Sequence, residues 1–142
     1  MASGKHEYLS QTQLNFIFNG GTWSAPGTLY IALLTVEASV SSKGTEATGS
    51  GYARITTTSN TTNWPTISGS TTTITNNVAQ SFATATGTWS SGSNMVGAGI
   101  FDSLTSGGSN NLYYWGDLTV AKPVINGDTA SFAIGAITVQ EL

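Results

Sequence analysis

The chain has 142 residues and a formal net charge of −3, and only 8% of its residues are charged, against about 25% in typical soluble domains. This length fits one domain, which can bury about two-thirds of the surface that the unfolded chain exposes. No basic stripe is present for a phosphate backbone, so nucleic acid is not an expected partner. The absence of cysteine excludes disulfides and thiolate sites.

The first elements in the chain are an arm and a helix. Residues 1–6 lack the apolar segment of a signal peptide and predict a flexible N-terminal arm. No stretch of the chain approaches the ~20 apolar residues that span a bilayer, so no membrane contact is expected. From Glu7 to Asn19, apolar residues recur at helical spacing: Leu9, Leu14, Ile17 and Phe18. We expect a short helix here, with an irregular strap as the alternative because Phe16 interrupts the apolar face.

The longest apolar run of the chain covers residues 28–36. Pro26 and Gly27 precede it, and a loop rich in Ser, Thr and Gly follows over residues 37–51. A continuous apolar run of this length, rich in residues that favour strands, is typical of a strand buried on both faces. It predicts the centre of the hydrophobic core.

Shorter and more polar segments follow, and turn residues separate them. The strands expected after the apolar run cover residues 52–57, 71–75, 77–84, 96–102, 112–120, 122–125, 129–134 and 136–140. Tight hairpin turns are expected at Asn76–Asn77 and at Asn126–Asp128. This spacing predicts an all-β fold, an antiparallel β-sandwich or barrel of about eight short strands with one short N-terminal helix. Residues 7–142 are expected to form a single β domain.

Few side chains offer catalytic chemistry. His6 is the one histidine and lies in the expected arm, so a Ser-His-Asp arrangement would need that arm to fold into a cleft. Four acidic residues remain for a glycosidase pair or a calcium site: Glu46, Asp102, Asp117 and Asp128. Nothing in their spacing brings them together. We therefore predict a non-enzymatic protein without a metal or cofactor.

Three tryptophans lie in expected loops, at positions 23, 64 and 89. They could stack on sugar rings as in a carbohydrate-binding module, or they could fill the core or a subunit interface. The second interpretation is favoured, and glycan binding is kept as an alternative. Arg54 is the one arginine, and its planar guanidinium predicts a salt bridge with Glu46 or Asp102, inside the subunit or across subunits.

Six motifs in a fixed order carry a family resemblance: Leu29–Thr35, Gly44–Glu46, Gly51–Arg54, Gly99–Asp102, Leu112–Gly116 and Gly127–Thr129 with Phe132. Together they resemble a family of small tailed-bacteriophage structural proteins, commonly labelled tail-fibre-like, with all-β capsid decoration proteins of similar size. The resemblance runs from about Leu9 to the end of the chain. It implies a virion protein made in the cytoplasm of a bacterial host.

Two virion roles compete on physical grounds. A fibre that reaches a receptor needs length from a repeated shaft, and this sequence has no such repeat. One compact domain with a short arm better fits a capsid decoration (cement) protein, a homotrimer that stabilises the major capsid protein lattice. A tail-fibre or baseplate component is the alternative, and a carbohydrate-binding module is a further one. The expected contact residues are Lys5, Tyr8, Leu9, Trp23, Arg54, Trp64 and Trp89.

Overall fold

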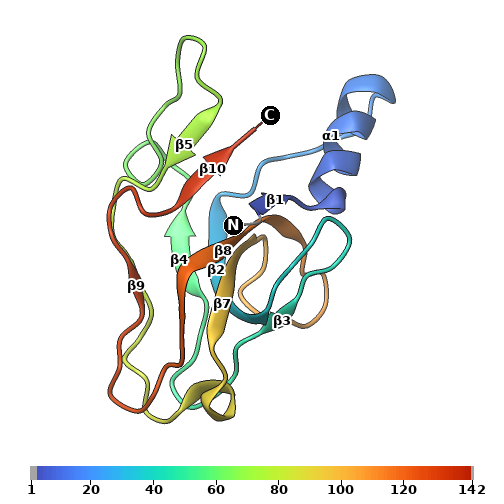
Figure 1. Ribbon diagram of the computed structural model, residues 1–142. Helices are drawn as coiled ribbons and strands as arrows, with labels where there is room; N and C mark the ends of the chain where they lie inside the picture. The colour runs from blue at the N-terminus through green and yellow to red at the C-terminus, as the bar shows by residue number, and fades with distance from the viewer. Residues whose placement is uncertain (1–2, 142) are drawn as a thin grey trace.

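The computed structural model describes residues 3–141, which form an antiparallel β-sandwich with one α-helix (Figure 1). The main sheet has the order β1-β8-β7-β2-β3, with β4 also pairing with β2, and two small sheets pair β5 with β10 and β6 with β9. This architecture confirms the predicted all-β class and N-terminal helix.

The elements are β1 (Ser3–Lys5), α1 (Glu7–Phe18), β2 (Thr28–Val36), β3 (Thr45–Glu46), β4 (Ile55–Thr58), β5 (Thr73–Thr75), β6 (Gln80–Ser81), the 3₁₀ turn η1 (Trp89–Gly92), β7 (Met95–Phe101), β8 (Leu112–Lys122), β9 (Ser131–Phe132) and β10 (Thr138–Gln140).

Strand β2 is buried on both faces, as its apolar run predicts. Successive side chains of a strand point to opposite faces of its sheet. Ile31 and Leu33 therefore enter one hydrophobic cluster, whereas Ala32 and Leu34 enter the other. All four are at most 3% exposed. Burying each of the larger side chains contributes about 1.5–3 kcal/mol to stability.

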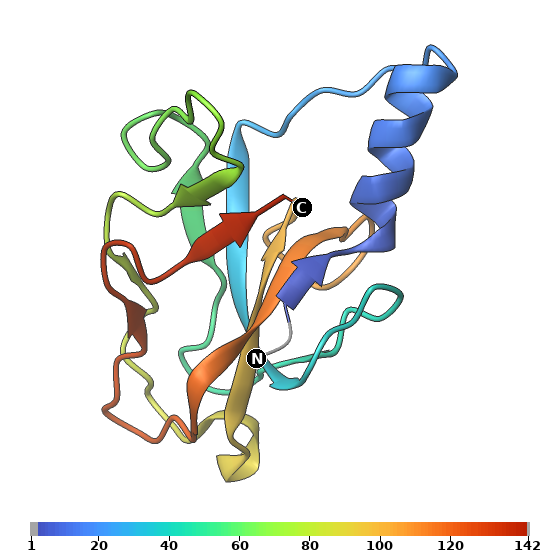
Figure 2. The same ribbon diagram turned by 45° about the horizontal axis from the view of Figure 1, so that its top comes forward.

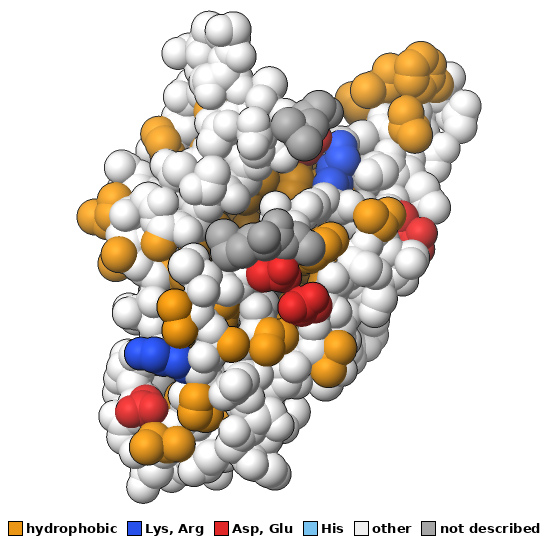
Figure 3. Space-filling model, viewed as in Figure 1, with side chains coloured by type: hydrophobic (Ala, Val, Ile, Leu, Met, Phe, Trp, Pro, Cys, Tyr) orange, Lys and Arg blue, Asp and Glu red, His pale blue; other side chains and the backbone are white. Residues whose placement is uncertain are grey.

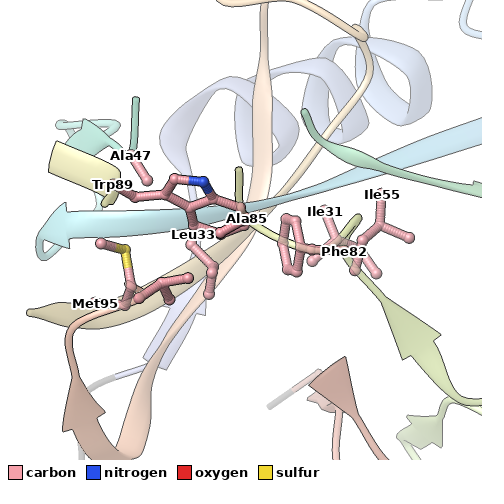
Figure 4. Packing of buried hydrophobic residues seen from close by; sticks show 9 residues of the cluster. Ile31, Leu33, Ala47, Ile55, Phe82, Ala85, Trp89 and Met95 are labelled. Atoms are coloured by element: carbon pink, nitrogen blue, oxygen red, sulfur yellow. The ribbon is translucent and has the colours of Figure 1, made fainter. Parts of the chain in front are cut away.

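The larger cluster lies between the main sheet and the segments around β6 and β9, and Figure 4 shows how its side chains pack. Its centre is Trp89, which is fully buried and whose indole Nε1 donates to the carbonyl of Ser50 at 3.1 Å. The rings of Tyr52 and Phe82 meet Trp89 edge-on, with centroids 5.0 and 5.9 Å away. Such edge-to-face pairs add about 0.5–1.5 kcal/mol each beyond area burial. Trp89 is thus the core residue that closes this side of the sandwich.

The second cluster lies on the opposite face of the main sheet. It contains Ala32, Leu34, Ala38, Phe101 and Leu112. Gly99 of β7 lies among them, and a Cβ at this position would approach the side chains of Phe101 and Leu112 within 2.8 Å. In Figure 2 the helix and the loop after β2 lie on this side of the sheet, away from β5, β9 and β10.

The prediction of a flexible arm is wrong for residues 3–6. Strand β1 pairs with β8, with Ser3 opposite Gly116 and Lys5 opposite Tyr114. His6 is only 5% exposed, and its backbone N–H donates to the carbonyl of Tyr113 at 2.9 Å. The physical reason is that β8 would otherwise be an edge strand with unpaired backbone groups, which β1 satisfies. Residues 1–2 of the predicted arm lie outside the described residues.

Neither of the two expected turns joins a pair of strands that are hydrogen-bonded to each other. The buried Asn76 side chain donates to the carbonyls of Val78 and Ala133 and accepts from the N–H of Ile137, so β5 pairs with β10 rather than with β6. At Asn126–Asp128 the turn forms, with the Asp128 N–H donating to the Ile125 carbonyl at 3.0 Å. The strand after that turn, β9, pairs with β6. A turn signal fixes a change of direction, but the strand partner is chosen by packing elsewhere.

Candidate interaction surface

Four of the predicted contact residues are enclosed by their own subunit. Leu9, Arg54, Trp64 and Trp89 are between 0% and 9% exposed. Each packs inside the subunit, so they are not available as surface contacts, and the prediction is corrected for these four. The remaining three are half-buried: Lys5, Tyr8 and Trp23. The residues that sequence reasoning selected therefore do not form one exposed patch.

Arg54 is the centre of a buried polar cluster. Its Nε and Nη2 donate to the two carboxylate oxygens of Glu46 at 2.8 and 2.6 Å, and its Nη1 donates to the Ser103 carbonyl and to Asn110 Oδ1, both at 2.7 Å. The guanidinium lies 4.0 Å from the centroid of the Phe101 ring. The bidentate pair confirms the predicted salt bridge inside the subunit, with Glu46 as the partner.

The hydrogen bonds of this cluster join β3, β2 and the loop after β7. Glu46 also accepts from the Tyr52 hydroxyl at 2.9 Å, and burial together with the Glu46 charge raises the pKa of Tyr52 far above its ordinary value. The Tyr52 oxygen in turn accepts from the Leu33 N–H, which ties the cluster to β2. Asp102, the other predicted partner of Arg54, instead accepts from the backbone and side chain of Asn111. Sequence reasoning missed Asn110, because a loop amide carries no signal of its own.

Residues 3–141 hold neither a metal-binding cluster of His, Cys, Asp and Glu side chains nor a helix that could cross a membrane. Those residues hold no group of three or more His, Cys, Asp or Glu side chains placed to bind a metal ion. Over the same part of the chain, no helix is long and apolar enough to cross a membrane. Of the acidic candidates, Asp128 is used in its own turn, where its carboxylate accepts from the Ile125 N–H at 3.1 Å.

The helix α1 presents a large apolar surface to solvent. Of the four residues of its predicted apolar face, only Leu9 is buried. Four side chains in its last two turns are 51–76% exposed, and we call them the α1 apolar end: Leu14, Phe16, Ile17 and Phe18. In Figure 1 this end of α1 points away from the sheet, and Figure 3 shows a group of hydrophobic side chains at the same corner. Exposed apolar groups of this kind mark interaction sites.

The first turn of α1, in contrast, is firmly held. His6 Nδ1 accepts from the Tyr8 N–H at 3.2 Å as the N-cap, and the Tyr8 ring stacks on Tyr113 with centroids 6.1 Å apart. The Glu7 N–H donates to the carbonyl of Val40 at 2.8 Å. Burial lowers the pKa of His6, with Glu7 opposing and Lys43 supporting this shift. The helix is thus fixed at its base and projects its apolar end.

Residues 4–140 match the family model described as "Podophage GP4 fiber I protein gp80". No curated protein matches the sequence. The family match includes every described strand except the first residue of β1, and it also includes α1.

Removing the Arg54 side chain should destabilise the fold strongly. Arg54→Ala leaves the half-buried Glu46 carboxylate without its cationic partner and removes the link to the loop after β7, so we expect a loss of about 3 kcal/mol in the free energy of unfolding, the low end for a broken buried pair. Urea denaturation followed by tryptophan fluorescence measures this loss. Lys122→Ala, at an exposed position of β8, is the control and should change stability by about 0.5 kcal/mol or less. A similar small change in Arg54→Ala would contradict the role of the cluster.

The N-cap of α1 should weaken at acidic pH. Neutral His6 accepts the Tyr8 N–H, so the stability linked to its lowered pKa is fully present above 6.5 and is lost as pH falls through the folded-state value. His6→Asn supplies a cap that does not titrate. Between about pH 8 and pH 5 we expect the wild-type protein to lose about 1 kcal/mol more than this variant. Parallel pH profiles in the two proteins would argue against the histidine cap.

Proposed function

We propose that this chain, which belongs to the Podophage GP4 fiber I protein gp80 family, is a non-enzymatic structural component of a podophage fibre. The observation that carries this proposal is the family match over residues 4–140. The Arg54 cluster also fits, because its ion pair is turned inward and is used by the fold.

The compact fold limits which part of a fibre the chain can form. A shaft gains length from repeats, whereas residues 3–141 form one sandwich whose strands pair within the subunit. A terminal or connecting domain of the fibre fits this shape. The same compactness also suits a capsid decoration protein on the major capsid protein lattice, the role that the sequence alone favours. We place the fibre role first because the family description names it.

We further propose that the α1 apolar end packs against the same surface of other copies, in a homotrimer. Leu14, Ile17 and Phe18 are spaced i, i+3, i+4, so they lie on one helix face in the pattern by which helices pack together. No residue between Tyr8 and Phe18 is charged. A symmetric contact brings identical residues close to each other, and an uncharged face does so without repulsion. A helix bundle around a threefold axis would bury these side chains.

The copy number of the protein in purified virions tests the fibre role. A fibre component should be present in a small number of copies per particle, because fibres are few compared with capsid subunits. Quantitative mass spectrometry against the major capsid protein measures the ratio. A ratio near one copy per capsid subunit would contradict the fibre role and support decoration.

A charge in the α1 apolar end should break self-association. Ile17 is 66% exposed and Val120 of β8 is 64% exposed, so they form a matched pair of positions. Ile17→Asp should reduce the solution mass from three subunits to the 14.6 kDa of one subunit, because burying an unpaired carboxylate opposes assembly. Val120→Asp should leave the mass of the assembly unchanged. Light scattering after size-exclusion chromatography gives both masses, and a trimeric Ile17→Asp variant would refute the proposed contact.

A further inference from the structure

The chain contains two Asn-Gly dipeptides, Asn19–Gly20 and Asn126–Gly127. In such a pair the backbone nitrogen of the glycine can attack the side-chain amide carbon of the asparagine, because glycine has no Cβ to hinder the approach. Both asparagines are exposed, so solvent reaches both side chains. Their reactivity is therefore decided by how the backbone holds each glycine nitrogen.

The turn at Asn126–Gly127 keeps its glycine nitrogen in a hydrogen bond. The Gly127 N–H donates to the carbonyl of Ala85 at 2.8 Å, and the Ala85 N–H donates to the carbonyl of Asp128 at 2.8 Å. The Asp128 carboxylate also accepts from the Ile125 N–H at 3.1 Å, which closes the turn from its other side. A nitrogen that keeps its proton in such a bond cannot act as a nucleophile until the turn opens.

The nitrogen of Gly20, at the end of α1, is not held in this way. No acceptor among residues 3–141 receives the Gly20 N–H, and apart from its chain neighbours no atom lies within 4 Å of the position that a Gly20 Cβ would take. The Asn19 side-chain amide donates to Asn15 Oδ1 at 2.8 Å, an exposed contact that water can replace. Beyond Gly21, whose N–H donates to the Asn15 carbonyl at 3.1 Å, residues 22–26 make no backbone hydrogen bond with the rest of the described backbone. The backbone at Asn19 can therefore rotate into the geometry for attack while the sandwich stays folded.

We propose that Asn19 is a site of deamidation in the folded protein, whereas Asn126 is protected. The Gly20 nitrogen gives up its proton through solvent and bonds to Cγ of Asn19, while Nδ2 takes up a proton and leaves as ammonia, so that a succinimide ring forms. Water then opens the ring and gives aspartate or isoaspartate, and water is the only co-reactant. Either product places a carboxylate at the carbonyl end of α1, directly after the α1 apolar end, where the helix dipole disfavours negative charge. This site does not depend on the fibre assignment or on the homotrimer.

Peptide mass spectrometry of the aged wild-type protein tests this site. One sample of the full chain is incubated in mildly alkaline buffer, and a second is incubated in the same buffer with denaturing urea. In the folded sample Asn19 should convert about tenfold faster than Asn126, because conversion at Asn126 first requires the loss of a backbone hydrogen bond. In urea the two sites should convert at similar rates, since neither glycine nitrogen is then held. Equal rates in the folded sample, or faster conversion at Asn126, would overturn the proposal.

A matched pair of variants assigns the product to its residue. Glutamine keeps the amide but would have to close a larger ring, so its conversion is much slower than that of asparagine. Asn19→Gln should lower the isoaspartate content of the aged, folded protein about tenfold, whereas Asn126→Gln should leave it nearly unchanged. Enzymatic methyl transfer to the isoaspartate carboxylate measures this content. An Asn126→Gln variant that loses most of its isoaspartate would also overturn the proposal.

Discussion

The burial of β2 on both faces is the constraint on which the rest of the structure depends. On one face of β2 the side chains pack against Phe82 and Trp89, and on the other face they pack against Phe101 and Leu112. Because both faces must be buried, a chain with so few charges folds into a layered sandwich. The Arg54 cluster connects the two hydrophobic clusters, because its guanidinium lies over Phe101 of the second cluster and its partner Glu46 accepts from Tyr52, which packs against the first. Its charges are tolerated inside because each is paired and hydrogen-bonded.

Both faces of β2 are covered within the subunit, whereas the α1 apolar end is exposed to solvent. The base of α1 is fixed by the His6 cap and by Leu9, whereas its last two turns contribute little to the core of the subunit. Exposing four large apolar side chains has no benefit for a monomer. In the proposed homotrimer these side chains would be covered by the same surface of other copies. The fold and the proposed contact therefore use different parts of the same 142 residues.

Local patterns in the sequence predict where the helix and the strands form. Which strands pair and which side chains are buried depends instead on contacts between residues that are far apart in the chain. The run over 28–36 and the helix from Glu7 are visible in sequence, because burial and helical spacing leave periodic signals. The turn at Asn126–Asp128 is visible too, but its strand partner is not, since β6 is far away in the chain. Trp64 and Trp89 lie outside the strands, yet packing encloses them. The Arg54–Glu46 pair was among the predicted alternatives, and only the structure selects it over Asp102.

Hydrogen exchange of the α1 amides, compared between the wild-type protein and the Ile17→Asp variant, tests the central claim most directly. If the body of the subunit is complete and α1 is the element of assembly, residues 11–18 should be protected in the wild-type protein and exchange rapidly in the variant. The amides of β2 should be protected in both proteins. Equal exchange of residues 11–18 in the two proteins would contradict the account, because it would show that other copies of the chain do not cover the α1 apolar end.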